Sequence, residues 1–183
     1  MALDHFVRHP VIPPLLAKAG GIKILVSMVS RGVKGALAPA FSILRQIVSS
    51  SSDLATQVHD AGLVQIVVKF LGQSDKLSET ALANAVLAIS CIAEVSPKLQ
   101  EAVGSAKGVF DALVGLFEHP EYQTCVEVLR ALTKSVGQIV ANNTENQNLC
   151  IDAGGASPLI MVSRANKHRD LQTSAINVSF IVV

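Results

Sequence analysis

Apolar residues recur along the chain at i, i+4, i+7 and i+11, the spacing that places them on one face of an α-helix. Four such stripes occur, and each predicts a long helix. The expected helices lie near residues 36–49, 78–95, 122–141 and 169–183. The stripe residues are Leu37, Phe41, Leu44 and Val48; Leu82, Val86, Ile89 and Ala93; Cys125, Leu129, Leu132 and Val136; and Leu171, Ala175, Val178 and Val182.

A short motif with a central glycine precedes each stripe. The aligned glycines are separated by 42, 46 and 46 residues, a period typical of solenoids whose units contain two or three helices. The stripes begin 17, 20, 17 and 17 residues after these glycines, so two registers repeat together. A glycine at this place fits a sharp turn between a short helix and the next one. The expected turns are at Gly20, Gly62, Gly108 and Gly154.

Two segments resemble a known repeat. Residues Glu145 to Gly155 are similar to the first helix of an armadillo repeat followed by its Ala-Gly-Gly turn, and residues Leu54 to Gly62 are a looser version of it. The resemblance extends over roughly residues 15 to 183. It implies an all-α fold, a right-handed α-solenoid of about 3.5 armadillo-type repeats, in a single domain spanning residues 1–183. HEAT repeats are the alternative, and the glycine turn between the first two helices favours armadillo.

The last stripe breaks off inside a predicted helix, with no Gly or Pro to end it. Each repeat has an apolar face that a stacked neighbour covers, and natural arrays end in caps with a polar outer face. We therefore expect a solenoid that is incomplete at its C-terminus and belongs to a longer array.

Composition narrows the classes of function. Hydrophobic residues make up 50% of the chain and charged residues 16%, against about 25% in typical soluble domains. Either a large area is expected to be buried on neighbouring protein, or the chain is an excerpt of a longer protein. The net charge is +1 and there is no run of Lys or Arg, which argues against a nucleic-acid partner. The apolar stretch between Glu79 and Glu94 is 14 residues long, whereas a membrane span needs about 18 or more. No membrane partner is expected.

The sequence contains no familiar catalytic or nucleotide-binding motif. The patterns GxGxxG, GxxxxGK[ST], GxSxG and SxxK are all absent. The closest metal-like spacing is His5 and His9 beside Asp4, but a structural zinc ion takes four ligands. We therefore expect no enzymatic activity, no small-molecule substrate, no cofactor and no metal.

The cysteines of the chain give an indication of its compartment. Cys91, Cys125 and Cys150 are odd in number and lack CxxC spacing. They are interpreted as reduced thiols packed within helices. Reduced cysteines favour a cytoplasmic or nuclear protein.

The resemblance also implies where a partner binds. In armadillo proteins the third helices line a concave groove that holds extended peptides. In the nuclear-import adaptors and the catenins, an Asn ladder on that helix clamps the peptide backbone, and the adaptors add a Trp one turn earlier. The Asn-equivalent positions of this chain hold Gln46, Cys91, Lys134 and Phe180, and the Trp-equivalent positions hold Ser42, Leu87, Arg130 and Ile176.

None of these eight positions carries the residue that the resemblance calls for. A backbone clamp needs an amide that both donates and accepts a hydrogen bond, and only Gln46 provides one. A basic import signal is disfavoured because Arg130 and Lys134 have the wrong sign. The apolar positions and this basic pair instead fit a partner helix or an acidic, hydrophobic segment. The alternative is that the basic pair is only a solvated face.

The expected function is a non-catalytic scaffold for protein–protein interaction that uses the concave groove. One alternative is a regulator of a GTPase or kinase, of the adaptor or exchange-factor type. An enzyme, the alternative from another class, would need a closed pocket with perturbed ionisable groups rather than a long open groove.

Overall fold

The structure is a computed structural model that describes residues 9, 11–33, 35–73, 77–165 and 167–182. These residues form twelve α-helices and no strand. The all-α fold expected from the sequence is confirmed.

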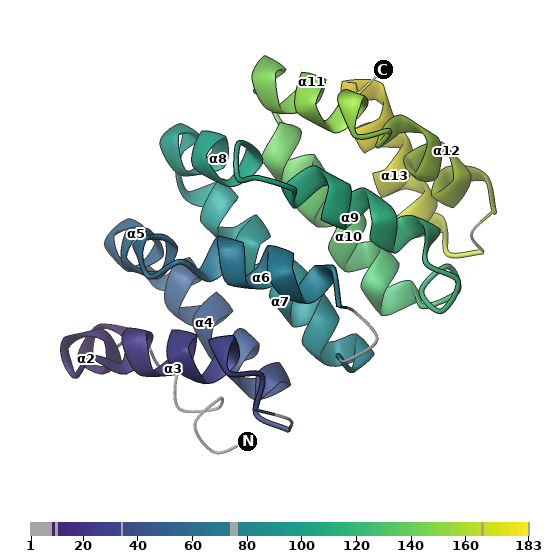
Figure 1. The fold of residues 1–183 in the computed structure, drawn as a ribbon. Coiled ribbons are helices and arrows are strands. Elements are labelled where there is room, and N and C mark those ends of the chain that lie inside the picture. The colour runs from purple at the N-terminus through teal and green to yellow at the C-terminus, as the bar shows by residue number, and fades with distance from the viewer. Residues whose placement is uncertain (1–8, 10, 34, 74–76, 166, 183) are drawn as a thin grey trace.

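The helices form four successive units of three. The units are stacked side by side, with α3, α6, α9 and α12 on one face and α4, α7, α10 and α13 behind them (Figure 1). The helices are α2 (Ile12–Lys18), α3 (Gly21–Ser30) and α4 (Leu37–Ser50); α5 (Ser52–Asp60), α6 (Leu63–Leu71) and α7 (Glu79–Val95); α8 (Pro97–Gly104), α9 (Val109–Glu118) and α10 (Val126–Val140); and α11 (Thr144–Asp152), α12 (Ala156–Ala165) and α13 (Arg169–Val182).

The number of units differs from the expected 3.5. The described residues hold four three-helix units, because the segment before Gly20 forms the separate helix α2. The last long helix, α13, has 14 residues, the same number as α4. Each unit therefore contributes a third helix to the stack.

The four predicted long helices are present, and the third begins later than expected. The sequence pattern placed its start near residue 122, whereas α10 begins at Val126. The preceding residues form turns instead, in which Tyr122 N donates to His119 O at 2.9 Å and Cys125 N donates to Tyr122 O at 3.1 Å. The buried Tyr122 ring packs on the His119 ring, with centroids 4.8 Å apart. This packing holds the turn in place and leaves Cys125 as the residue before the helix.

Side-chain caps explain where several helices begin. A helix leaves its first backbone N–H groups without partners, and a Ser or Asn just before it supplies an acceptor. Ser51, Ser78 and Ser96 accept at 3.2 Å, and Asn143 accepts at 3.0 Å, from the N–H three residues further on. These caps fix the starts of α5, α7, α8 and α11.

The glycine motif forms the turn between the first and second helices of each unit. Gly20, Gly62, Gly108 and Gly154 have φ between +76° and +85°. This left-handed backbone is costly for any residue with a Cβ atom. The repeat of glycine in the sequence is therefore a repeat of one backbone conformation.

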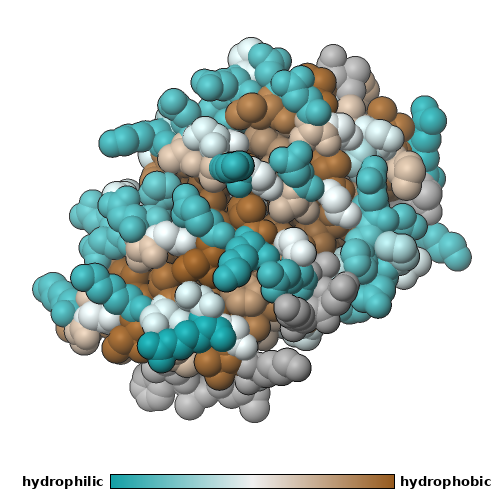
Figure 2. All heavy atoms as spheres, in the orientation of Figure 1, coloured by the Kyte–Doolittle hydropathy of each residue, from teal (hydrophilic) through white to brown (hydrophobic). Residues whose placement is uncertain are grey.

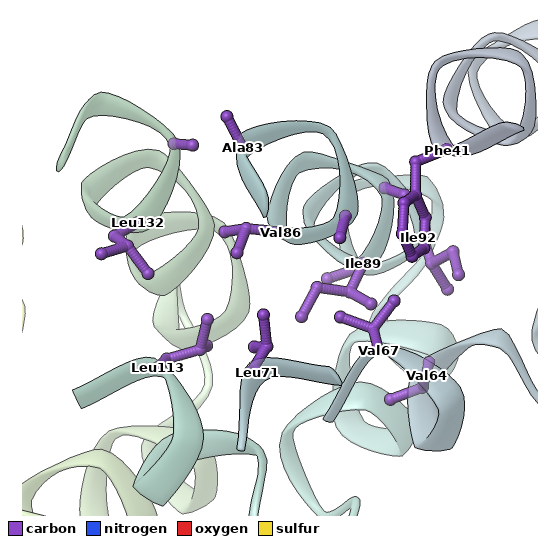
Figure 3. Close-up of a cluster of buried hydrophobic side chains, with 14 of the residues drawn as sticks. Phe41, Val64, Val67, Leu71, Ala83, Val86, Ile89, Ile92, Leu113 and Leu132 are labelled. Carbon is purple, nitrogen blue, oxygen red and sulfur yellow. The ribbon is translucent and has the colours of Figure 1, made fainter. Parts of the chain in front are cut away.

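The apolar stripes meet in a continuous core that runs between the units. Figure 3 shows part of it, where Ile89 of α7, Val67 of α6 and Phe41 of α4 lie close together. The Phe41 ring also meets the Phe70 ring edge-on, with centroids 6.4 Å apart. A buried hydrogen bond of 3.0 Å from Ser135 Oγ to Val86 O links α10 to α7. Contacts between neighbours thus hold the solenoid together.

Among the described residues, no single helix has both the length and the apolar character of a membrane span. The helices α2 and α3, bent by 81° at their junction, have that length and composition only when taken together.

Candidate functional site

The third helices α4, α7, α10 and α13 form one surface of the molecule, here called the third-helix surface. Each of them carries two of the eight predicted groove residues. Those of α4 and α7 are half-buried, whereas those of α10 and α13 are exposed. Phe180 is 81% exposed. The surface is therefore most accessible in its α10–α13 half.

The predicted groove residues of α4 and α7 contact other parts of the same chain. Gln46 Nε2 lies 3.5 Å from Ser42 Oγ, one turn away on the same helix. Leu87 and Cys91 pack against the hydrophobic core. Gln46, the amide in the ladder position, is thus turned partly toward its own helix.

Arg130 forms an ion pair that sequence reasoning did not anticipate. Its Nε donates to Asp170 Oδ2 at 2.9 Å, and Nη2 lies 2.7 Å from the same oxygen. The two side chains are 50% and 62% exposed, and the pair joins α10 to α13. Of the predicted basic pair, Arg130 is therefore neutralised by Asp170, whereas Lys134 makes no ion pair with a described residue.

The ion pair affects the carboxylate of Asp170. Desolvation raises the pKa of Asp170, but the hydrogen bond and the positive charge of Arg130, with backbone hydrogen bonds of Leu171 and Asp170, lower that pKa overall. A lowered pKa keeps the carboxylate charged until the pH falls through that lowered value. The pair is therefore formed throughout the neutral range.

A cleft of about 510 Å³ lies between α10 and α13 on the third-helix surface. Arg130 and Lys134 line this cleft together with residues that were not predicted as groove residues. Ile176 and Phe180 do not line it. Gly137 allows the helices to approach, since a Cβ atom there would lie 2.9 Å from Val178 Cγ2. The additional polar residues of the cleft are Thr133, Gln138, Asp170, Ser174 and Asn177.

Thr133 has an unusual environment in this cleft. Its side chain is 1% exposed, and Oγ1 makes no hydrogen bond with any described residue. An unsatisfied buried hydroxyl costs about 1–3 kcal/mol. Ser90, the equivalent residue of α7, is also buried without a hydrogen bond but does not line the cleft. Thr133 is thus an unused hydrogen-bonding group at the edge of an open space.

A second cleft, of about 840 Å³, lies between the first two units. Ile22, Val26 and Ile66 contribute its apolar lining, and Lys23 and Asp60 are among its charged residues. Figure 2 shows hydrophobic residues in the furrow between these units. The cleft was not predicted from the sequence, because it depends on how far α3 and α6 lie apart.

In the part of the chain that the structure describes, no group of three His, Cys, Asp or Glu side chains lies close enough to hold a metal ion. Of the metal-like trio considered from the sequence, Asp4 and His5 lie outside the described residues, and only His9 is described.

The three thiols differ in burial. Cys150 is fully buried, and this burial raises its pKa to about 11 from the ordinary 9.0. Burial also raises the pKa of Cys125, with Glu79 adding to the effect and backbone hydrogen bonds opposing it. Cys91 is half-buried.

We expect Cys150 to be alkylated most slowly by iodoacetamide at pH 8. The thiolate is the nucleophile, and a pKa two units higher lowers its concentration on the order of 100-fold. Because the folded state holds this proton more tightly, its contribution to stability is lost as the pH rises from about 9 to about 11. Mass spectrometry of timed aliquots should rank the rates Cys91, Cys125, Cys150, and urea should abolish the ranking. A Cys150 that reacts as fast as Cys91 in the folded chain would contradict the burial.

Comparisons with known proteins bear on the fold. No family model and no curated protein matches the sequence. Among solved structures, a designed armadillo repeat protein has a TM-score of 0.80 and 22% identity, covering 93% of this chain and 68% of that one. Another, in complex with peptide (KR)4, has a TM-score of 0.75 and 23% identity, covering 93% and 66%. The armadillo-repeats-only protein of Plasmodium falciparum has a TM-score of 0.79 and 13% identity, covering 100% and 78%.

These three structures share less than a quarter of their residues with the chain and nearly all of its architecture. Their agreement covers at least 93% of it. In this chain, the four three-helix units with a left-handed glycine after each first helix match the repeat expected from the sequence. The chain has the armadillo-repeat fold.

Proposed function

We propose that the chain is a non-catalytic scaffold that binds a segment of another protein along the third-helix surface. The observation that carries this proposal is the set of eight positions on α4, α7, α10 and α13, half-buried or exposed, with a cleft between the last two helices. Such a surface offers a long, open contact to an extended or helical segment. A scaffold that regulates a bound GTPase or kinase would use the same surface.

We further propose that the partner segment is acidic or apolar. None of the eight positions holds a carboxylate, and Lys134 makes no ion pair with a described residue. A designed armadillo repeat protein of the same fold was solved with the basic peptide (KR)4. The positive charge of Lys134 would repel such a peptide and attract one of opposite sign.

Site-specific photo-cross-linking tests this proposal. The cross-linking amino acid p-benzoylphenylalanine replaces Leu87 or Ile176 on the third-helix surface, and Gln65 or Met161 on the second helices as matched controls. We expect cross-linked partner segments from the first pair only, because the partner lies within reach of those side chains alone. Sequencing the cross-linked fragments by mass spectrometry should give segments rich in Asp, Glu and apolar residues. Cross-linking that is equal at the controls would contradict the proposal.

A further inference from the structure

We propose that the cleft between α10 and α13 is a subsite that receives the carboxylate of an Asp or Glu side chain from an extended partner segment. This inference rests on the proposed function, because the cleft is part of the third-helix surface.

The first support is a pair of neighbouring donors. Lys134 is exposed, lines the cleft and makes no ion pair with a described residue. Thr133, the adjacent residue, also lines the cleft, and its hydroxyl is buried without a partner. A carboxylate accepts hydrogen bonds from both an ammonium group and a hydroxyl, and such bonds are strong because the acceptor is charged. Because Thr133 Oγ1 is fully buried, a ligand oxygen reaches it only once the side chain rotates toward the cleft, and it would then satisfy the hydroxyl that the chain itself leaves unsatisfied.

The second support is a pair of amides on opposite walls of the cleft. Gln138 lies one turn after Lys134 on α10, and Asn177 lies on α13, three residues before Phe180. Neither side chain is hydrogen-bonded to another described residue. An amide both donates and accepts, so it can pair with a peptide backbone. In the α10–α13 half of the surface, the chain thus has amides beside the ladder positions, which hold Lys134 and Phe180, rather than at them.

The third support is the apolar lining. Leu171 and Val178 are buried residues of α13 that border the cleft, and Gly137 brings α10 against Val178. The methylene groups of a Glu side chain would contact this apolar lining while its carboxylate reaches Lys134. The lining therefore suits a side chain with an aliphatic stem and an acidic end.

Asp170 limits the positive charge of the cleft. It lines the same cleft and holds Arg130 through two contacts to one oxygen. A partner carboxylate therefore competes with Asp170 for Arg130, and Lys134 is the cation left to it. Removal of the Asp170 charge should strengthen the binding of an acidic segment.

The test uses three capped octapeptides, (Glu-Thr)4, (Gln-Thr)4 and (Lys-Thr)4, in which Thr favours the extended backbone. Each is titrated into the ¹⁵N-labelled chain, and chemical-shift changes report both affinity and location. We expect (Glu-Thr)4 to bind about tenfold more tightly than (Gln-Thr)4, as one charge-assisted hydrogen bond would give. The shifts should cluster at Thr133, Lys134, Gln138 and Asn177. (Lys-Thr)4 should bind most weakly.

Substitutions separate the subsite from a structural role. Lys134→Gln should bring the affinity for (Glu-Thr)4 down to that for (Gln-Thr)4. Thr133→Val should weaken (Glu-Thr)4 about threefold without lowering the melting temperature, because it removes an unsatisfied hydroxyl. Ser90→Ala, the matched change one unit earlier, should leave peptide affinity unchanged. Asp170→Asn should raise the affinity for (Glu-Thr)4 about threefold, since Arg130 becomes available.

Two outcomes overturn the inference. In the first, (Glu-Thr)4 binds, but the chemical-shift changes that it causes lie on α4 and α7, or its affinity is unchanged by Lys134→Gln and Thr133→Val. In the second, none of the three peptides shifts the cleft residues at millimolar concentration. Either result leaves the photo-cross-linking test of the third-helix surface standing, so failure of the subsite is distinguishable from failure of the proposed function.

Discussion

Replacing Gly104 by alanine is expected to lower the free energy of unfolding by about 3 kcal/mol, from overpacking and broken hydrogen bonds together. Gly104 is the last residue of α8 and is buried. A Cβ atom at this position would overlap the side-chain amide of Asn146 on α11. Because Asn146 is itself fully buried, its amide cannot move aside without leaving its partners.

The bonds that Asn146 makes explain the size of the effect. Its Nδ2 donates to Gln100 O at 3.1 Å and to Ile139 O at 2.9 Å. Gln100 in turn donates through Nε2 to Gln138 O and Ala141 O, both at 2.8 Å. These contacts tie α8 to the end of α10 and the start of α11. Displacing Asn146 therefore loosens the junction between the third and fourth units.

A double-mutant cycle in urea measures this coupling. Gly104→Ala, Asn146→Ala and the double variant are compared with the unchanged chain. The double variant should lose less than the two single losses together, by at least about 1 kcal/mol, because the alanine at 146 removes the overlap. The control is Gly115→Ala on α9, where a Cβ atom meets nothing within 4 Å. That change should stabilise by roughly 0.5–1 kcal/mol, since alanine favours the helix. Additive losses at 104 and 146 would refute the proposed contact.

The fold was predictable because its signals are local. Helix formation depends on residues within a few turns, so the stripe Leu82, Val86 and Ile89 identified both a helix and its buried face, and all three residues are fully buried. A left-handed turn depends on one residue, so the glycines identified the junctions. The late start of α10 was missed because it depends on Tyr122 packing on His119, a contact that no periodicity records.

The candidate site was predictable only as far as the helical face. The period of the stripes placed Arg130 and Lys134 on the third helix, but not the groups opposite them. Asp170 lies 40 residues beyond Arg130, and their contact depends on the rotation between successive units. The orphan hydroxyl of Thr133 depends on the same rotation. A search for opposite charges near the exposed faces of neighbouring third helices could have suggested the ion pair.

Asn146 shows the same limit for a structural residue. Polar residues such as Asn are usually exposed in helices, so nothing in the sequence pattern indicates that this residue of α11 is buried. Its full burial follows from the approach of α8, which Gly104 permits. The burial of Asn146 can therefore be predicted only when Gly104 of the preceding unit is considered together with it.

Replacing Ile89 by alanine is expected to cost about 3 kcal/mol and to destabilise the whole chain. Ile89 is fully buried in α7, which packs on α4 on one side and on α10 on the other. In a solenoid each unit is stabilised by its neighbours, so a defect in a central helix weakens two junctions. The matched change Ile22→Ala, on α3 of the first unit and 4% exposed, removes the same side chain from a place with one neighbouring unit.

Hydrogen exchange distinguishes the two variants. Ile89→Ala should speed the exchange of backbone amides in α4, α7 and α10 alike, because the opening of the centre separates the two halves of the stack. Ile22→Ala should speed exchange mainly in α2, α3 and α4 and leave α10 and α13 protected. The urea midpoint should fall more for Ile89→Ala than for Ile22→Ala. If both variants lose protection uniformly along the chain, the units unfold as one block and the nearest-neighbour description of this solenoid is wrong.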